Sequence, residues 1–124
     1  RAVRQPYAKP CRATMTTHEQ YGLPISAITA LLHVFSQWPA VDSVWLYGSR
    51  AKGNFRAGSD IDLTVKGCDL AMEDLLAMEN QIDDLLLPWS VDLSLFADID
   101  SDSLREHIER VGIVFYRKPL AGHH

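Results

Sequence analysis

The chain has 124 residues, 47% of them hydrophobic, and a formal net charge of −4 at pH 7. This length fits one small domain with a modest core. No apolar run approaches the roughly 18 residues of a membrane span and no secretory signal is visible, so a membrane is not an expected partner. The two cysteines, Cys11 and Cys68, do not form a disulfide framework, and we expect a reducing cytoplasm.

The two ends of the chain differ from its centre. Residues 1–14 carry four basic side chains, no acid and no periodic apolar pattern, so we interpret them as a leader that is disordered or non-native. Residues 121–124 resemble a tag remnant, which leaves residues 15–120 as a single domain. Residues 15–124 contain eight Lys and Arg against sixteen Asp and Glu, a net charge of −8. So acidic a domain is a poor binder of nucleic-acid backbone, and a polynucleotide is not expected as a ligand of this chain alone.

Helical and extended patterns alternate along the domain. Apolar residues recur at helical spacing between Ile25 and Phe35, and shorter stretches alternate polar and apolar residues as strands do. In chain order we expect a helix over about 25–35, strands at about 43–47 and 60–65, a long helix capped by Asp69 and ended by Pro88, a strand over 89–96, a helix over 104–111 and a strand over 113–116. This order predicts an α/β (α+β) fold, a small mixed β-sheet with helices packed on one face and the active site on the other.

A Gly-Ser pair follows the first predicted strand. Gly48 lets the backbone approach a ligand closely, and free N–H groups at a helix start attract an anion. Ser49 adds a hydroxyl, and Arg50, Lys52 and Arg56 supply three cations soon afterwards. We therefore predict that these five residues bind the phosphates of a nucleotide.

Two aspartates follow this turn, and a third lies in a later strand. In a strand over 60–65, Asp60 and Asp62 project from one face while apolar residues alternate to the other. Asp92 sits among apolar residues of the later strand, where it can project from the same sheet face. Like charges held this close repel, and a divalent cation between them is the simplest reason for such a set; Mg²⁺ prefers oxygen ligands of this kind. We predict that Asp60, Asp62 and Asp92 are metal ligands and catalytic residues.

Simpler roles stay open for several side chains. Each of the three cations near the turn can be a solvated or structural charge instead of a phosphate contact, and Asp92 can be an edge-strand charge. Trp45 and Tyr47 are more typical of a core than of a nucleobase platform. His33 and His107 have no companion at metal-ligand spacing, which favours surface or packing roles.

The combined pattern resembles a known superfamily. Gly48-Ser49, ten residues, Asp60-x-Asp62 and then Asp92 in a later strand resemble the polymerase-β-type nucleotidyltransferases. The short chain resembles their minimal nucleotidyltransferase (MNT) branch, often encoded beside a HEPN-domain partner. The resemblance covers about residues 25–118 and implies the nucleotidyltransferase core fold.

The three aspartates and this resemblance lead to one functional hypothesis. The chain would be a Mg²⁺-dependent nucleotidyltransferase that transfers a nucleoside monophosphate, preferably AMP from ATP, to a hydroxyl. Asp60 and Asp62 would bridge two Mg²⁺ ions, while Asp92 would complete the metal site and accept the hydroxyl proton. The MNT branch implies a HEPN protein as partner, modified with AMP on a tyrosine in a toxin–antitoxin pair.

Two other functions stay open. The chain can be an antitoxin that neutralises its HEPN partner by covering it, with little or no catalysis. Transfer to a small molecule such as an aminoglycoside is less favoured, because the sequence offers no substrate domain. Acceptor recognition is expected to come from a partner or an oligomer interface, so we expect a homo- or hetero-oligomer.

Overall fold

The structure is a computed structural model that describes residues 19–119. The predicted leader at 1–14 and the predicted tag remnant at 121–124 lie outside this range, as do residues 15–18 and 120 of the predicted domain. None of the helices within 19–119 has the length and apolar content needed to cross a bilayer.

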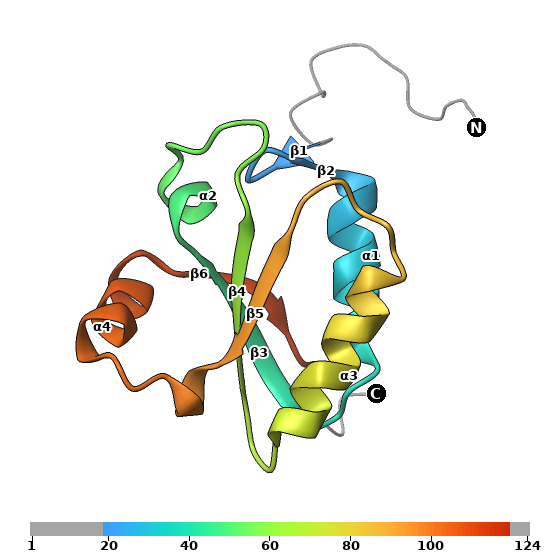
Figure 1. Cartoon of the computed structure of the whole chain (residues 1–124), viewed down its shortest axis with the longest axis vertical. Helices are drawn as coiled ribbons and strands as arrows, with labels where there is room; N and C mark the ends of the chain where they lie inside the picture. Colours follow the sequence, from blue (N-terminus) through green and yellow to red (C-terminus); the bar gives the residue numbers. More distant parts are fainter. Residues whose placement is uncertain (1–18, 120–124) are drawn as a thin grey trace.

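A mixed four-stranded sheet forms the centre of the molecule, as expected (Figure 1). Its strands are β3 (Val41–Tyr47), β4 (Ile61–Gly67), β5 (Val91–Leu95) and β6 (Ile113–Arg117), in the order β5-β4-β3-β6. β3 runs antiparallel to β4 and β6, whereas β4 and β5 are parallel. A small hairpin of β1 (Glu19–Gln20) and β2 (Leu23–Pro24) lies apart from this sheet.

Two helices pack on one face of the sheet. These are α1 (Ile25–Ser36) and α3 (Met72–Asp83), both on the same side of the strands in Figure 1. α3 connects β4 to β5, because parallel neighbours need a crossover rather than a tight hairpin. Phe35 of α1, Met78 of α3 and Leu63 of β4 are fully buried in the core between these layers. Burial of each such side chain contributes roughly 1.5–3 kcal/mol.

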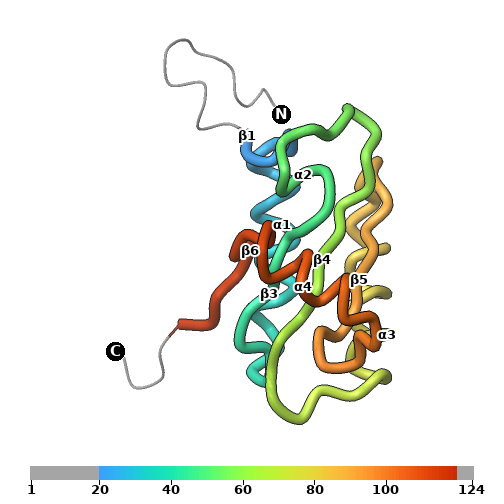
Figure 2. Tube along the Cα trace, turned by 90° about the vertical axis from the view of Figure 1, so that its left-hand side faces the viewer, coloured from blue at the N-terminus to red at the C-terminus, as the bar shows by residue number. Residues whose placement is uncertain are grey.

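A third helix lies on the opposite side. α4 (Asp102–Val111) follows the short 3₁₀ turn η2 (Phe96–Asp98), and Figure 2 shows it in front of the sheet, with α1 behind. Ile108 of α4 is fully buried in a second small cluster with Tyr47 and Phe96. α1 and α3 thus lie on one face of the sheet, as expected. α4 differs, because it covers part of the face that carries the predicted site.

The predicted cap of α3 was wrong. The residue before the helix is Ala71, whose backbone N–H donates to the Asp74 carboxylate over 2.9 Å. Asp69 lies two residues earlier in the left-handed conformation (φ 58°), where it turns the chain after β4. A short polar residue tolerates that conformation better than most, so Asp69 serves the turn rather than the helix end.

Candidate active site

Two of the predicted aspartates lie side by side on the face that α4 partly covers. Asp62 of β4 is the register partner of Asp92 on β5, and Tyr47 of β3 is the partner of Asp62 on its other side. Neighbouring strands lie about 4.8 Å apart and partners point to the same face. The register therefore builds a row of Tyr47, Asp62 and Asp92 across three strands.

The third aspartate precedes this row in the chain. Asp60 is exposed and lies immediately before β4, which begins at Ile61. Burial, and then the negative charges of Asp92 and Asp60, raise the pKa of Asp62 above its ordinary value. The three predicted carboxylates thus share one electrostatic environment, with Asp62 at its centre.

This carboxylate set does not by itself enclose a cation. Within residues 19–119, no group of three or more His, Cys, Asp or Glu side chains is gathered closely enough to hold a metal ion. Mg²⁺ does not require such a cage, because it commonly takes one or two carboxylates and fills its remaining positions with water and substrate phosphates. The pair formed by Asp62 and Asp92 is a donor set of that kind.

The Gly-Ser turn lies directly against Asp62. Gly48 has φ 77° and ψ −157°, a conformation that essentially only glycine adopts. A Cβ atom at Gly48 would collide with the Asp62 carboxylate, so the missing side chain allows this close approach. The short helix α2 (Ser49–Lys52) starts here, and its first N–H groups have no carbonyl one turn earlier to receive them.

The three predicted phosphate-binding cations occupy different environments. Lys52 and Arg56 are exposed, and Lys52 ends α2 close to the turn. Arg50 is only 2% exposed, and its guanidinium donates to the backbone carbonyls of Tyr21, Ala57 and Ser59. This environment favours the structural role that the sequence left open for Arg50.

Several neighbours of the carboxylates were not predicted as site residues. Tyr47 is 9% exposed, and the pKa of its hydroxyl is raised, mainly by burial and further by the charges of Asp92 and Asp62, while the nearby Ser94 side chain offsets part of the rise. The ring of His107, on α4, meets the Tyr47 ring edge-on with centroids 6.3 Å apart. Strand alternation could have placed Tyr47 on this face, but its partnership with Asp62 depends on a register that the sequence does not reveal.

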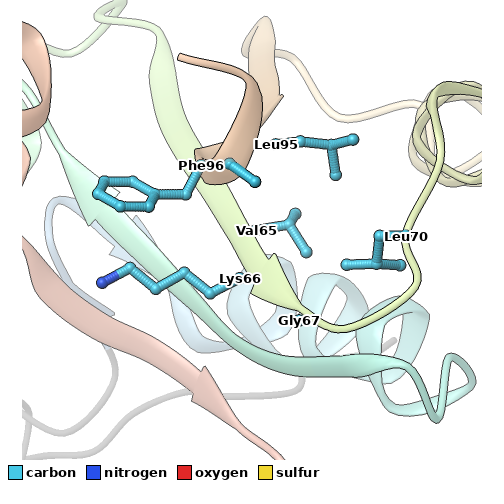
Figure 3. Close-up of a pocket in the computed structure, with 7 residues that line it drawn as sticks. Val65, Lys66, Gly67, Leu70, Leu95 and Phe96 are labelled. Atoms are coloured by element: carbon cyan, nitrogen blue, oxygen red, sulfur yellow. The ribbon is translucent and has the colours of Figure 1, made fainter. Parts of the chain in front are cut away.

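A separate hollow lies at the other end of β4. It has a volume of about 200 Å³ and is lined by Val65, Lys66, Gly67, Leu70, Leu95, Phe96 and Ala97 (Figure 3). The Lys66 ammonium lies 4.5 Å from the Trp45 ring centroid and 4.4 Å from that of Phe96. Asp62 and Asp92 do not line this hollow, so it is distinct from the carboxylate row.

Comparison with protein families decides the classification. Residues 30–119 match the family described as polymerase beta, nucleotidyltransferase. The chain belongs to this nucleotidyltransferase family. The match includes the Gly-Ser turn and all three aspartates, so the predicted membership is confirmed by a comparison independent of the fold.

Individual relatives agree with this assignment. The probable protein adenylyltransferase MntA of Haemophilus influenzae is 31% identical over 107 residues, covering 84% of this chain and 91% of the relative. A crystal structure of a toxin–antitoxin with AMP-PNP superposes with a TM-score of 0.58 at 23% identity, covering 75% of this chain and 73% of the other. A structure of a tri-AMPylated Shewanella oneidensis HEPN toxin in complex with its MNT antitoxin gives a TM-score of 0.57 at 18% identity, covering 76% and 72%. The two structural similarities confirm the predicted fold.

Proposed function

We propose that this nucleotidyltransferase transfers AMP from ATP to a hydroxyl group of a HEPN-domain partner protein. The observation that carries the proposal is the position of Asp62, which lies directly against the Gly48 turn and is the register partner of Asp92 on the neighbouring strand. A phosphate-binding turn and a carboxylate pair in contact are what nucleotidyl transfer requires. The similarity to an adenylyltransferase at 31% identity supports AMP as the transferred group.

Two Mg²⁺ ions held jointly with the nucleotide are part of the proposal. Burial, and then repulsion by Asp92 and Asp60, make ionised Asp62 unfavourable, and a cation at this point would relieve the repulsion. We propose Asp60, Asp62 and Asp92 as the protein ligands. When bound, the metal would neutralise developing charge on the phosphates and make the acceptor hydroxyl a better nucleophile.

Other residues of the chain would bind the phosphates and accept the proton of the acceptor hydroxyl. The N–H groups at the start of α2, the Ser49 hydroxyl and the exposed side chains of Lys52 and Arg56 would hold the β and γ phosphates. The acceptor oxygen forms a bond to the α-phosphorus while the bond to the bridging oxygen of the β-phosphate breaks and pyrophosphate leaves. Asp92 lies exposed on the edge strand β5, where it can accept the proton of an incoming hydroxyl.

The acceptor is proposed from the relatives. One structure with a similar fold is an MNT antitoxin in complex with a tri-AMPylated HEPN toxin. Within residues 19–119 the four-stranded sheet, its helices and the small β1–β2 hairpin leave no second domain to recognise an acceptor. A HEPN partner bound beside β5 would bring its hydroxyl to Asp92.

The test is the transfer of label from α-labelled ATP to a HEPN protein encoded in the same genome, with Mg²⁺ present. The wild-type chain is expected to label the partner. The variants Asp60→Asn and Asp62→Asn are expected to lose more than the roughly 10–100-fold typical of residues that only support a metal ligand. Asp42→Asn is the matched control, because Asp42 is exposed and pairs with Lys118 over 3.8 Å. Transfer by the Asp60 and Asp62 variants at the parental rate would show that the site is assigned incorrectly.

A further inference from the structure

We infer that Arg50 is a positioning residue that fixes Asp60 relative to the Gly48-Ser49 turn, and that it does not bind the triphosphate. The inference deepens the proposed function and rests on it for the role of Asp60. It concerns the one residue of the predicted phosphate set whose side chain is buried.

The guanidinium of Arg50 is committed to backbone carbonyls. Nε donates to Ser59 O over 3.1 Å, Nη1 to Tyr21 O over 2.9 Å, and Nη2 to both Ala57 O at 3.2 Å and Ser59 O at 2.8 Å. These four hydrogen bonds use four of the five N–H donors that an arginine carries. Because only 2% of Arg50 is exposed, its guanidinium offers little accessible surface to a phosphate group from solution.

Aromatic side chains complete the enclosure. The guanidinium carbon lies 5.1 Å from the ring centroid of Phe55 and 5.9 Å from that of Trp89. The Trp89 indole N–H also donates to Ala57 O over 3.1 Å, so the same carbonyl is held from two sides. Arg50 therefore anchors the loop between α2 and β4 at several points.

The backbone on both sides of Asp60 is held by hydrogen bonds, and those on one side come from Arg50. The carbonyl of Ser59, directly before Asp60, receives two of the Arg50 hydrogen bonds. The N–H of Ile61, directly after Asp60, donates to Ser90 O over 2.9 Å. Because Arg50 follows Ser49 in α2, a single side chain links the phosphate-binding turn to the first carboxylate and sets their separation.

Lysine cannot replace arginine in this arrangement. A lysine ammonium is one point with three donors, whereas three carbonyls at different positions need the planar fork of a guanidinium. Arg50→Lys should therefore loosen residues 57–60 while it keeps the positive charge. A phosphate contact would predict the opposite, since lysine binds phosphate as a point charge and would retain much of the affinity for ATP.

The experiment compares Arg50→Lys with the wild-type chain in two measurements. In AMP transfer to a HEPN partner, kcat is expected to fall at least about tenfold, the Mg²⁺ concentration for half-maximal rate to rise several-fold, and KM for ATP to stay within about twofold. Independently of transfer, Mn²⁺ affinity in the presence of AMP-PNP, measured by electron paramagnetic resonance, is expected to fall several-fold. Arg110→Lys, on the exposed side of α4, is the matched control and should leave all values unchanged.

A second variant keeps the inference testable if Arg50→Lys does not fold. Trp89→Phe keeps an aromatic ring beside Arg50 but removes the hydrogen bond to Ala57 O, and should shift the Mg²⁺ requirement in the same direction by less. A tenfold rise in KM for ATP with kcat unchanged, or unchanged Mn²⁺ affinity in both variants, would overturn the inference. If the wild-type chain binds Mn²⁺ and AMP-PNP but transfers no AMP, the proposed function fails while the Mn²⁺ measurement still tests Arg50.

Discussion

Asp62 combines partial burial with two nearby negative charges, and together these raise its pKa. In the folded chain its proton is held more tightly than in the unfolded chain. Its contribution to stability is therefore greatest below the ordinary pKa and is lost as the pH rises through the raised pKa. Above the raised pKa and without metal, the ionised side chain destabilises the fold.

This cost predicts a stability gain from Asp62→Asn. Without Mg²⁺ at neutral pH, Tm should rise by at most a few degrees, because solvent screens the charge of this partly exposed side chain and about 1 kcal/mol corresponds to roughly 4–8 °C in a domain of this size. The gain should shrink as the pH falls, since the wild-type carboxylate becomes protonated. Thermal melts between pH 4 and 8 measure it, with the exposed Asp42→Asn as control. A lower Tm for Asp62→Asn at neutral pH would contradict the electrostatic description.

Lys52, unlike the buried Arg50, is an exposed cation beside the Gly48-Ser49 turn. It is exposed at the end of α2, so its cation is available to a phosphate. Lys52→Met should raise KM for ATP roughly tenfold, because a hydrogen bond to a charged group contributes about 1.5–3 kcal/mol. Lys118→Met, at a lysine paired with Asp42, is the matched control. Equal KM values for both variants would remove Lys52 from the phosphate-binding set.

At the scale of elements, the junction between β3 and α2 depends on the glycine at position 48. Any other residue at position 48 would have to adopt a backbone conformation that costs about 1–3 kcal/mol, and its Cβ atom would collide with the Asp62 carboxylate. Gly48→Ala should therefore reduce the free energy of unfolding by at least about 1 kcal/mol and abolish transfer.

Chemical denaturation and the transfer assay measure the two effects of Gly48→Ala. Gly58→Ala is a suitable control, because a Cβ atom there would meet nothing within 4 Å. The control is expected to stay within about 0.5 kcal/mol of the wild type. Full activity of Gly48→Ala would mean that the turn and Asp62 need not be in contact.

The strands were predictable because their alternation is local. Ile61, Leu63 and Val65 alternate with polar residues, and the strand predicted at about 60–65 is β4 at Ile61–Gly67. Asp62 and Asp92 were placed on one face for the same reason, and their direct partnership confirms it. The start of α3 was missed, because a short polar residue such as Asp69 suits either a helix cap or a left-handed turn. The structure has Asp69 in the turn, and the residue before the helix is Ala71.

The role of Arg50 could not be read from the sequence because its partners are distant or are backbone atoms. One carbonyl belongs to Tyr21, 29 residues earlier in the chain, and the others come from Ala57 and Ser59. The residue types in a sequence indicate neither which backbone carbonyls a side chain will reach nor whether that side chain will be buried. Lys52 lies two positions from Arg50 and carries the same charge, so only the fold distinguishes the two.

For the molecule as a whole, α1 and α3 cover one face of the sheet, and the proposed site lies on the other face. α1 and α3 close the core, while α4 covers part of the opposite face and leaves Asp92 exposed on the edge strand (Figures 1 and 2). Such an open edge beside the carboxylates suits an acceptor that arrives on another protein. The proposal therefore predicts that catalysis and partner binding meet at β5.

The most direct test is the intact mass of a HEPN protein from the same genome after incubation with this chain, ATP and Mg²⁺. The account predicts added masses of one or more AMP groups with the wild-type chain, and none with Asp62→Asn or Asp92→Asn. A partner that is neutralised by the wild-type chain and by both variants, with its mass unchanged, would contradict the account and show that covering the partner is sufficient.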